Sequence, residues 1–275
     1  GELLMNQRKS LKELNLLDKF LFDEAMDDPE NVKTMLDIIL SQNTNLKHPP
    51  QTEKEQRTST DNRQIRLDVY AIDEDDVIYE VEAQKENTHN LPKRSRLYQG
   101  IIDSKLLPPG VVDFNLLNEV LIVLIMPFDL FGYGLYRYTF QMKCEEVPEL
   151  KLDDGATRIF LNTRGKHPEL VSPELIELLK YMEHSTDEIS EACESKRIQE
   201  MHRRVCQIKA SEKAEVKYMQ TWEEKILIKQ EGERIGLERI NRLNQKLVEQ
   251  GRFDDLTKAT SDSSYQEKLL KEFKI

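Results

Sequence analysis

RLDVYAIDEDDVIYEVEAQ, residues 66–84, is the stretch that decides the fold. Apolar and polar residues alternate on both sides of the acidic segment DEDD, which predicts a β-hairpin within residues 63–85. When the turn is placed over residues 73–77, one face of the hairpin carries only apolar side chains and is suited to a core. These side chains are Leu67, Val69, Ala71, Tyr79, Val81 and Ala83.

The other face of this hairpin is acidic. The same turn places Asp68 opposite Glu82 and Tyr70 opposite Glu80. Like charges directly opposed, with Cβ atoms about 4.5–5.5 Å apart, destabilise a sheet. A divalent cation between Asp68 and Glu82 would relieve this repulsion, and Mg²⁺ takes carboxylate oxygens while it keeps several waters. Two alternatives stay open: a solvated sheet face, or a shift of one residue in the turn that makes the two acids diagonal neighbours.

The segments before and after the hairpin differ in their periodicity. Helical spacing predicts one or two helices over residues 11–40, with a new helix beginning at Pro29 after an acidic cap. Residues 41–62 are polar with a proline pair, which predicts a mobile loop. A helix is expected over residues 91–107, and the apolar residues 120–128 are typical of a buried central strand.

A further pair of strands is expected at residues 134–143 and 158–162. The sequence therefore predicts an α/β fold in which a mixed sheet is flanked by helices. After Pro173 nearly all the chain has helical spacing. We expect one α/β domain over residues 1–184 and an all-helical region over residues 185–275.

The helical region 185–275 is highly charged and carries only a loose heptad pattern. Two short helices are expected at its end, at residues 253–260 and 264–273. The region is interpreted as a self-association module that makes the chain a homo-oligomer, most simply a dimer. A single solvated helix explains its charged stretch equally well.

Composition limits the function classes. The 275 residues carry a formal net charge of −11, which argues against a protein that coats nucleic acid nonspecifically but is compatible with an acidic metal site. The longest apolar stretch, residues 116–126, is too short to cross a bilayer, and no secretion signal is apparent. Three cysteines without CxxC spacing and five histidines without ligand spacing predict neither disulfides nor a zinc cluster, so a cytoplasmic protein is expected.

The hairpin resembles the core of the Rpn family, the recombination-promoting nucleases also labelled PD-(D/E)XK nuclease family transposases. Other blocks along nearly the whole chain are similar to that family in the same order. These blocks are LLDKFLFDEAMDDPENVKTMLDIIL (16–40), LPKRSRLYQGIID (91–103), PFDLFGYGLYRYTF (127–140), LDDGATRIFLNTRG (152–165) and GRFDDLTKATSDSSYQEKLLKEF (251–273).

The resemblance implies that residues 1–184 form a restriction-endonuclease-like catalytic domain that hydrolyses DNA with Mg²⁺, or with Mn²⁺ in its place. It assigns Asp68 and Glu82 as metal ligands, with a further ligand in the backbone carbonyl of Ala83. Asp18, on the first helix, matches an acidic position that would bind the metal through water. No nucleotide cofactor and no membrane partner is expected.

Gln84 stands where the wider superfamily has a lysine. The lysine orients or activates the attacking water, whereas glutamine is neutral and can only form hydrogen bonds. The Rpn family itself commonly carries this glutamine. Lys85 is the neighbouring candidate for the role of the lysine, although strand alternation directs it to the opposite face unless the strand bulges.

Basic residues in the helix that follows the hairpin are candidates for DNA binding: Lys93, Arg94 and Arg96, with Tyr98 assisting. The alternative for each is an ordinary charged helix surface. The function expected is a Mg²⁺-dependent DNA endonuclease with little sequence preference, in recombination or phage defence. The competing hypothesis is an inactive or weakly active nuclease-fold protein that serves in DNA binding or in assembly.

Overall fold

The computed structural model of the chain describes residues 9–56 and 65–275. The chain divides into two compact units, residues 1–214 and 215–275. This division lies beyond the expected boundary at residues 184 and 185. The reason is that two helices after this boundary, α6 (Asp187–Ala192) and α7 (Lys196–Lys209), pack on the helices of the first unit.

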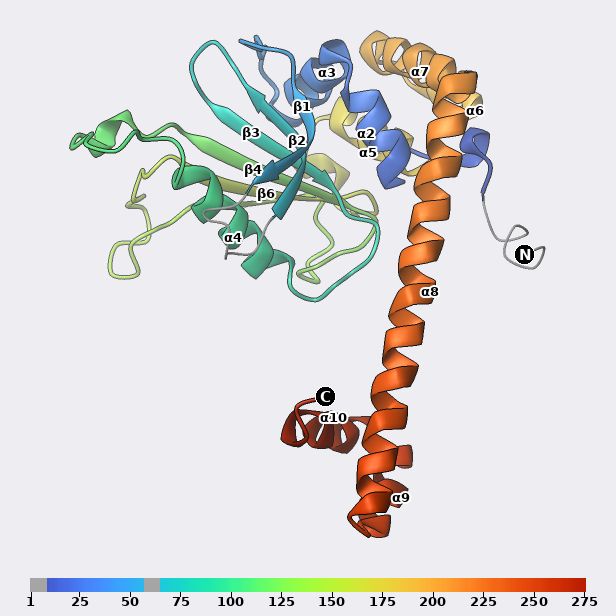
Figure 1. The fold of residues 1–275 in the computed structure, drawn as a ribbon. Helices are drawn as coiled ribbons and strands as arrows, with labels where there is room; N and C mark the ends of the chain where they lie inside the picture. The colour runs from blue at the N-terminus through green and yellow to red at the C-terminus, as the bar shows by residue number, and fades with distance from the viewer. Residues whose placement is uncertain (1–8, 57–64) are drawn as a thin grey trace. The chain divides into compact units, whose positions relative to one another are not determined.

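A six-stranded mixed sheet forms the centre of the first unit, in the order β1-β2-β3-β4-β6-β5 (Figure 1). The strands are β1 (Gln51–Gln56), β2 (Ile65–Ile72), β3 (Ile78–Ala83), β4 (Val120–Met126), β5 (Arg137–Phe140) and β6 (Ala156–Asn162). β3, β4 and β6 are parallel neighbours, while β1, β2 and β5 pair antiparallel. The expected mixed α/β sheet, its central strand β4 and the pair β5–β6 are confirmed.

The register of the β2–β3 hairpin is the one expected from the sequence. Val69 pairs with Val81, and Tyr70 pairs with Glu80. Asp73 anchors the turn, because its side chain accepts hydrogen bonds from the backbone nitrogens of Asp75 (3.0 Å) and Val77 (2.9 Å). Asp68 and Glu82 lie one residue beyond the Val69–Val81 pair, away from the turn, and are on the same face of the sheet as Tyr70 and Glu80.

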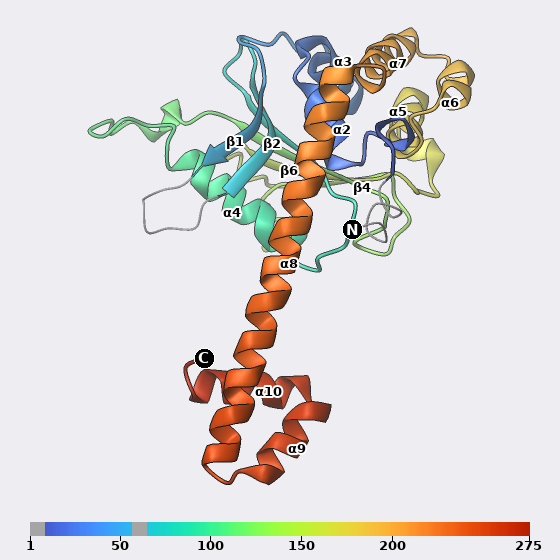
Figure 2. The ribbon, with the colours of Figure 1, turned by 45° about the vertical axis from the view of Figure 1, so that its right-hand side comes forward.

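The expectation of a loop over residues 41–62 is wrong for residues 51–56, which form the edge strand β1 beside β2 (Figure 2). Residues 57–62 of that prediction lie outside the described residues. β1 has no apolar alternation because an edge strand needs little core packing of its own. It is held by pairing with β2, and the ammonium group of Lys54 lies 3.5 Å from the centre of the Tyr70 ring.

Helices lie on both faces of the sheet (Figure 1). One layer contains α4 (Leu91–Asp103), whose Tyr98, Ile101 and Ile102 pack in one apolar cluster with β4 residues such as Ile122 and Leu124. Another contains α2 (Lys19–Met26), α3 (Pro29–Leu40) and α5 (Pro173–Glu183), joined by α7. The predicted start of α3 is confirmed, because the Asp28 side chain accepts from the Glu30 nitrogen and Pro29 opens the helix.

Short 3₁₀ turns occur at Leu11–Glu13, Phe114–Leu116 and Pro168–Leu170. In the second unit the end of α8 (Glu212–Glu249) packs with α9 (Phe253–Ser261) and α10 (Ser263–Glu272). Leu243, Leu247, Ala259 and Leu269 form its small buried core. Within the described ranges, we find no helix that combines the length and the apolarity needed to cross a bilayer.

Candidate functional site

The acidic face of the β2–β3 hairpin is buried. Glu80 has no solvent exposure, and Asp68 and Glu82 are each only 7% exposed. The cause is the parallel pairing of β3 with β4, which places Glu80 beside Ile122 and Glu82 beside Leu124 on the face that α4 covers. The alternative of a solvated sheet face is therefore wrong, and the three carboxyl groups need another source of stabilisation.

Asp68 is paired with a lysine from another part of the chain. The Lys19 ammonium group, in the first turn of α2, donates to Asp68 Oδ1 at 2.5 Å and lies 3.1 Å from Asp23 Oδ2. The pKa of Lys19 is raised: burial lowers it, but the charges of Asp68 and Asp23 outweigh the burial. Lys19 was not among the residues singled out from the sequence, because 49 positions separate it from Asp68.

Glu82 is paired with an arginine from α4. The Arg94 guanidinium group donates to Glu82 Oε1 and to Gln84 Oε1, the latter at 2.5 Å. Burial raises the pKa of Glu82 to about 7, against the opposing effect of Arg94 and with a further contribution from Asp68. Arg94 therefore belongs to the carboxylate cluster, and it also contacts Gln84, the residue that follows β3.

Glu80 is the least stabilised of the three acids. Both of its carboxyl oxygens are buried without a hydrogen-bond partner, as is Oε2 of Glu82. Burial raises the pKa of Glu80 well above its ordinary value, and the charges of Glu82 and Asp68 raise it further. Asp68 and Glu82 each have one cation as partner, Lys19 and Arg94 respectively, whereas Glu80 has none among the described residues.

Asp18 and Lys85 meet each other near these groups. Asp18 precedes α2 and accepts from the Asn15 nitrogen at 2.9 Å, and Lys85 donates to its other carboxyl oxygen. β3 ends at Ala83, so strand alternation no longer fixes the direction of Lys85. Lys85 thus contacts Asp18, whereas Lys19 is the lysine on Asp68.

The remaining candidates lie on or under α4. Lys93 and Arg96 are exposed. Tyr98 is buried against the sheet, and its pKa is raised by burial and by the charge of Glu82. Lys93 and Arg96 are therefore accessible to a partner from solution. Tyr98 is instead buried in the apolar layer between α4 and the sheet.

The donor set of this site suits a hard divalent cation. Carboxylate oxygens are the ligands that Mg²⁺ prefers, and the unpartnered oxygens of Glu80 and Glu82 lack the bonds that buried acceptors normally make. Side-chain movement is still required, since Lys19 and Arg94 now hold the other oxygens. Among the described residues, three potential ligand atoms come within 4.8 Å of one another elsewhere, at Asp187, His202 and Cys206.

Comparison of the chain with protein-family models, with curated proteins and with solved structures gave no match.

Proposed function

We propose that this chain is a metal-dependent DNA endonuclease with a restriction-endonuclease-like core, in which Asp68 and Glu82 bind the metal. The observation that carries the proposal is the buried acidic cluster on β2 and β3, with carboxyl oxygens of Glu80 and Glu82 left without partners. Burying such groups costs several kcal/mol unless they are compensated, so a cluster of this kind indicates a site kept for function.

Mg²⁺, or Mn²⁺ in its place, would be held by Asp68, Glu82 and the Ala83 carbonyl, where it would polarise the scissile phosphate and lower the pKa of a water. Lys19 stabilises negative charge that develops on the phosphate, the role that a lysine at position 84 would have had. Gln84 is oriented by Arg94 and hydrogen-bonds the water. Asp18 positions Lys85 at the edge of the site.

The substrate proposed is double-stranded DNA with little sequence preference, in recombination or in phage defence. The exposed side chains of Lys93 and Arg96 on α4 are suited to phosphate contacts. Contacts of this kind hold the DNA without reading its sequence, and their contribution falls as salt rises. An Arg96→Ala variant should therefore weaken DNA binding equally for unrelated sequences.

The test is plasmid nicking with Mg²⁺ by the full chain, compared with Asp68→Asn and Glu82→Gln. Both substitutions keep side-chain shape and remove the ligand charge, so each should slow nicking at least 100-fold, a loss typical of an essential catalytic group. The matched control is Glu74→Gln, which changes an exposed acid in the turn of the same hairpin. Equal nicking rates for wild type and both site variants would refute the proposal.

The second candidate is a nuclease-fold protein that binds DNA without cutting it. One observation favours it: Asp68 and Glu82 each already have a cation as partner, so neither needs a metal for neutralisation. Calorimetric titration with Mg²⁺ separates the two candidates. A nuclease should show binding that is lost in Asp68→Asn, whereas the DNA-binding protein should show DNA affinity that is independent of Mg²⁺.

We propose further that the second unit self-associates. Ile228 and Ile235 lie seven residues apart on α8, hence on one face of the helix, and they are 73% and 44% exposed. A second copy of the chain would bury them. Light scattering should give the mass of a dimer for the wild type and that of a monomer for Ile228→Glu/Ile235→Glu, while a dimeric double variant would exclude this face.

A further inference from the structure

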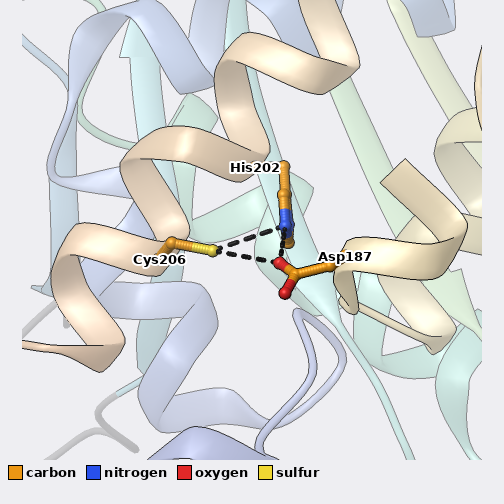
Figure 3. A group of neighbouring side chains, drawn as sticks. All are labelled: Asp187, His202 and Cys206. Carbon is orange, nitrogen blue, oxygen red and sulfur yellow. Dashed lines mark hydrogen bonds and ion pairs between the residues drawn. The ribbon is translucent and has the colours of Figure 1, made fainter. Parts of the chain in front are cut away.

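A second cluster of ligand-type side chains lies among the helices, away from the acidic hairpin. His202 and Cys206 are four residues apart on α7, so they share one face of that helix, and Asp187 reaches them from the start of α6 (Figure 3). His202 Nε2 lies 2.8 Å from Asp187 Oδ1 and 3.4 Å from Cys206 Sγ, and that sulfur lies 3.9 Å from the same carboxylate oxygen.

These separations are close to those around a tetrahedral zinc ion. Zinc bonds of about 2.0–2.3 Å at tetrahedral angles place an imidazole nitrogen roughly 3.3 Å from an oxygen and about 3.6 Å from a sulfur ligand. The distance between His202 and Asp187 must widen by roughly 0.5 Å, and that between Cys206 and Asp187 must shorten by roughly 0.3 Å, to reach this geometry. The Asp187 side chain is 85% exposed, so it has room to move.

The other nitrogen of His202 is already held. Nδ1 lies 2.9 Å from the hydroxyl of Tyr181, a residue of α5 that is fully buried. Metal-binding histidines usually donate their second N–H to a fixed acceptor, which sets the tautomer and directs the lone pair at the metal. Tyr181 can accept this bond, which frees Nε2 for a ligand.

The same geometry disfavours a cysteine nucleophile. In a catalytic triad the acid and the nucleophile contact opposite nitrogens of the histidine, so that a proton can pass between them. Here Asp187 and Cys206 both face Nε2, and Nδ1 is occupied by Tyr181.

We infer that Asp187, His202 and Cys206 form a binding site for Zn²⁺, with a fourth position open to solvent. A pocket of 380 Å³ borders all three side chains and is also lined by Lys12, Ser185 and Lys209, so a water can complete the tetrahedron. The donor set of sulfur, nitrogen and oxygen suits zinc better than Mg²⁺. The site would fasten α6 to α7, and it does not depend on the proposed nuclease activity.

His202 and Cys206 are four residues apart in the sequence. The prediction that the histidines lack ligand spacing compared the histidines only with one another. The evidence for a metal site comes from Asp187 and Tyr181, which α6 and α5 bring into contact with the imidazole of His202.

Cobalt titration of the full chain, stripped with a chelator and kept reduced, tests the inference. The wild type should bind one Co²⁺ at this site, with the absorption of a thiolate–cobalt bond and of four-coordinate cobalt. Cys206→Ser should lose the thiolate absorption, and Asp187→Asn, at an exposed position, should bind at least tenfold more weakly. Cys144→Ser removes a thiol of similar exposure and should behave as wild type.

A second measurement uses only the unmodified chain. Zinc should slow alkylation of Cys206 by iodoacetamide at least tenfold, as followed by mass spectrometry, while alkylation of Cys144 in the same sample keeps its rate. The inference is overturned if the wild type shows no thiolate–cobalt absorption, if Cys206→Ser retains it, or if zinc leaves the alkylation of Cys206 unchanged.

Discussion

The acidic cluster on the hairpin and the cluster around His202 differ in the burial and in the partners of their carboxylates. On β2 and β3 the acids are buried, and Asp68 and Glu82 have cations as partners. On α6 and α7 a single, exposed acid contacts a histidine that also contacts a thiol. The cluster on the hairpin offers a metal only oxygen atoms, whereas the cluster on the helices offers one oxygen, one nitrogen and one sulfur atom.

This difference bears on what each cluster can bind. The carboxylates of Asp68 and Glu82 already have ammonium and guanidinium partners, so a divalent cation must displace these partners to bind. We therefore expect weak metal binding at the hairpin, as is usual for the Mg²⁺ of phosphate chemistry. A set of one nitrogen, one sulfur and one oxygen atom within 4.8 Å favours a transition metal that stays bound. The two clusters therefore predict different responses to the same metal and to the same kind of substitution.

The largest effect is expected at Lys19. If it supplies the positive charge opposite the scissile phosphate, Lys19→Met should lower the nicking rate roughly 100- to 1,000-fold, as for loss of one positioned transition-state donor. Lys85→Met is the matched control, because Lys85 contacts Asp18 and not Asp68. Its nicking rate should stay within about threefold of wild type, given its place at the edge of the site. The reverse order of the two rates would assign the role to Lys85.

The next effect is a pH dependence of stability that comes from Glu82. Its pKa in the folded chain is about 7, above the ordinary 4.5, so the folded state binds this proton more tightly than the unfolded state. The resulting stabilisation is complete below pH 4.5 and is lost as the pH rises through 7. Its size is about 3 kcal/mol at most.

Glu82→Gln should remove that component of the pH dependence. The measurement is urea unfolding of chelator-treated wild type and variant at several values between pH 5 and 8. The difference in free energy of unfolding, variant minus wild type, should increase toward pH 8. Asp187→Asn gives the contrast from the other cluster, because that acid is exposed. A constant difference between wild type and Glu82→Gln would mean that Glu82 titrates normally.

The sequence predicted the hairpin well, because alternation on both strands and the DEDD turn allow one register with a buried apolar face. It did not predict β1, where QTEKEQ carries no apolar alternation and pairing with β2 supplies the order. The acidic positions Asp68 and Glu82 followed from the register. Their partners Lys19 and Arg94 did not, since which helix residues reach a strand depends on packing between distant segments.

The helical cluster shows the same limit more strongly. Helical structure after Pro173 was predicted in general terms, and the helix Lys196–Lys209 brings His202 and Cys206 together. Asp187 and Tyr181 join them only because α5, α6 and α7 pack on one another. The sequence analysis did not predict this cluster: the local pattern indicates which residues share a helix, and the contacts between helices come from tertiary structure.

A moderate effect is expected from Tyr181→Phe, which removes one hydroxyl from a fully buried ring. If Tyr181 fixes the tautomer of His202, zinc affinity should fall about 10- to 100-fold, the usual cost of losing a hydrogen-bond partner behind a metal ligand. Competition with a chromophoric chelator measures it. Tyr79→Phe, whose hydroxyl bonds Asp73 at 2.6 Å in the hairpin turn, is the matched control and should leave zinc affinity unchanged.

The smallest effect is expected from loss of the N-terminal cap of α7, the helix that carries His202 and Cys206. Ser195 caps α7, where its hydroxyl accepts from the Ile198 nitrogen at 3.4 Å and donates to Glu174. Ser195→Ala should cost about 1 kcal/mol of stability. His202 lies beyond the first turn of α7, so fraying at the cap should reduce zinc affinity only a fewfold and should leave nicking unchanged. Asp262→Ala, which removes the side-chain cap of α10 in the second unit, should leave zinc affinity unchanged. A large loss of zinc affinity in Ser195→Ala alone would mean that the helical cluster, unlike the strand-borne one, depends on the integrity of a helix end.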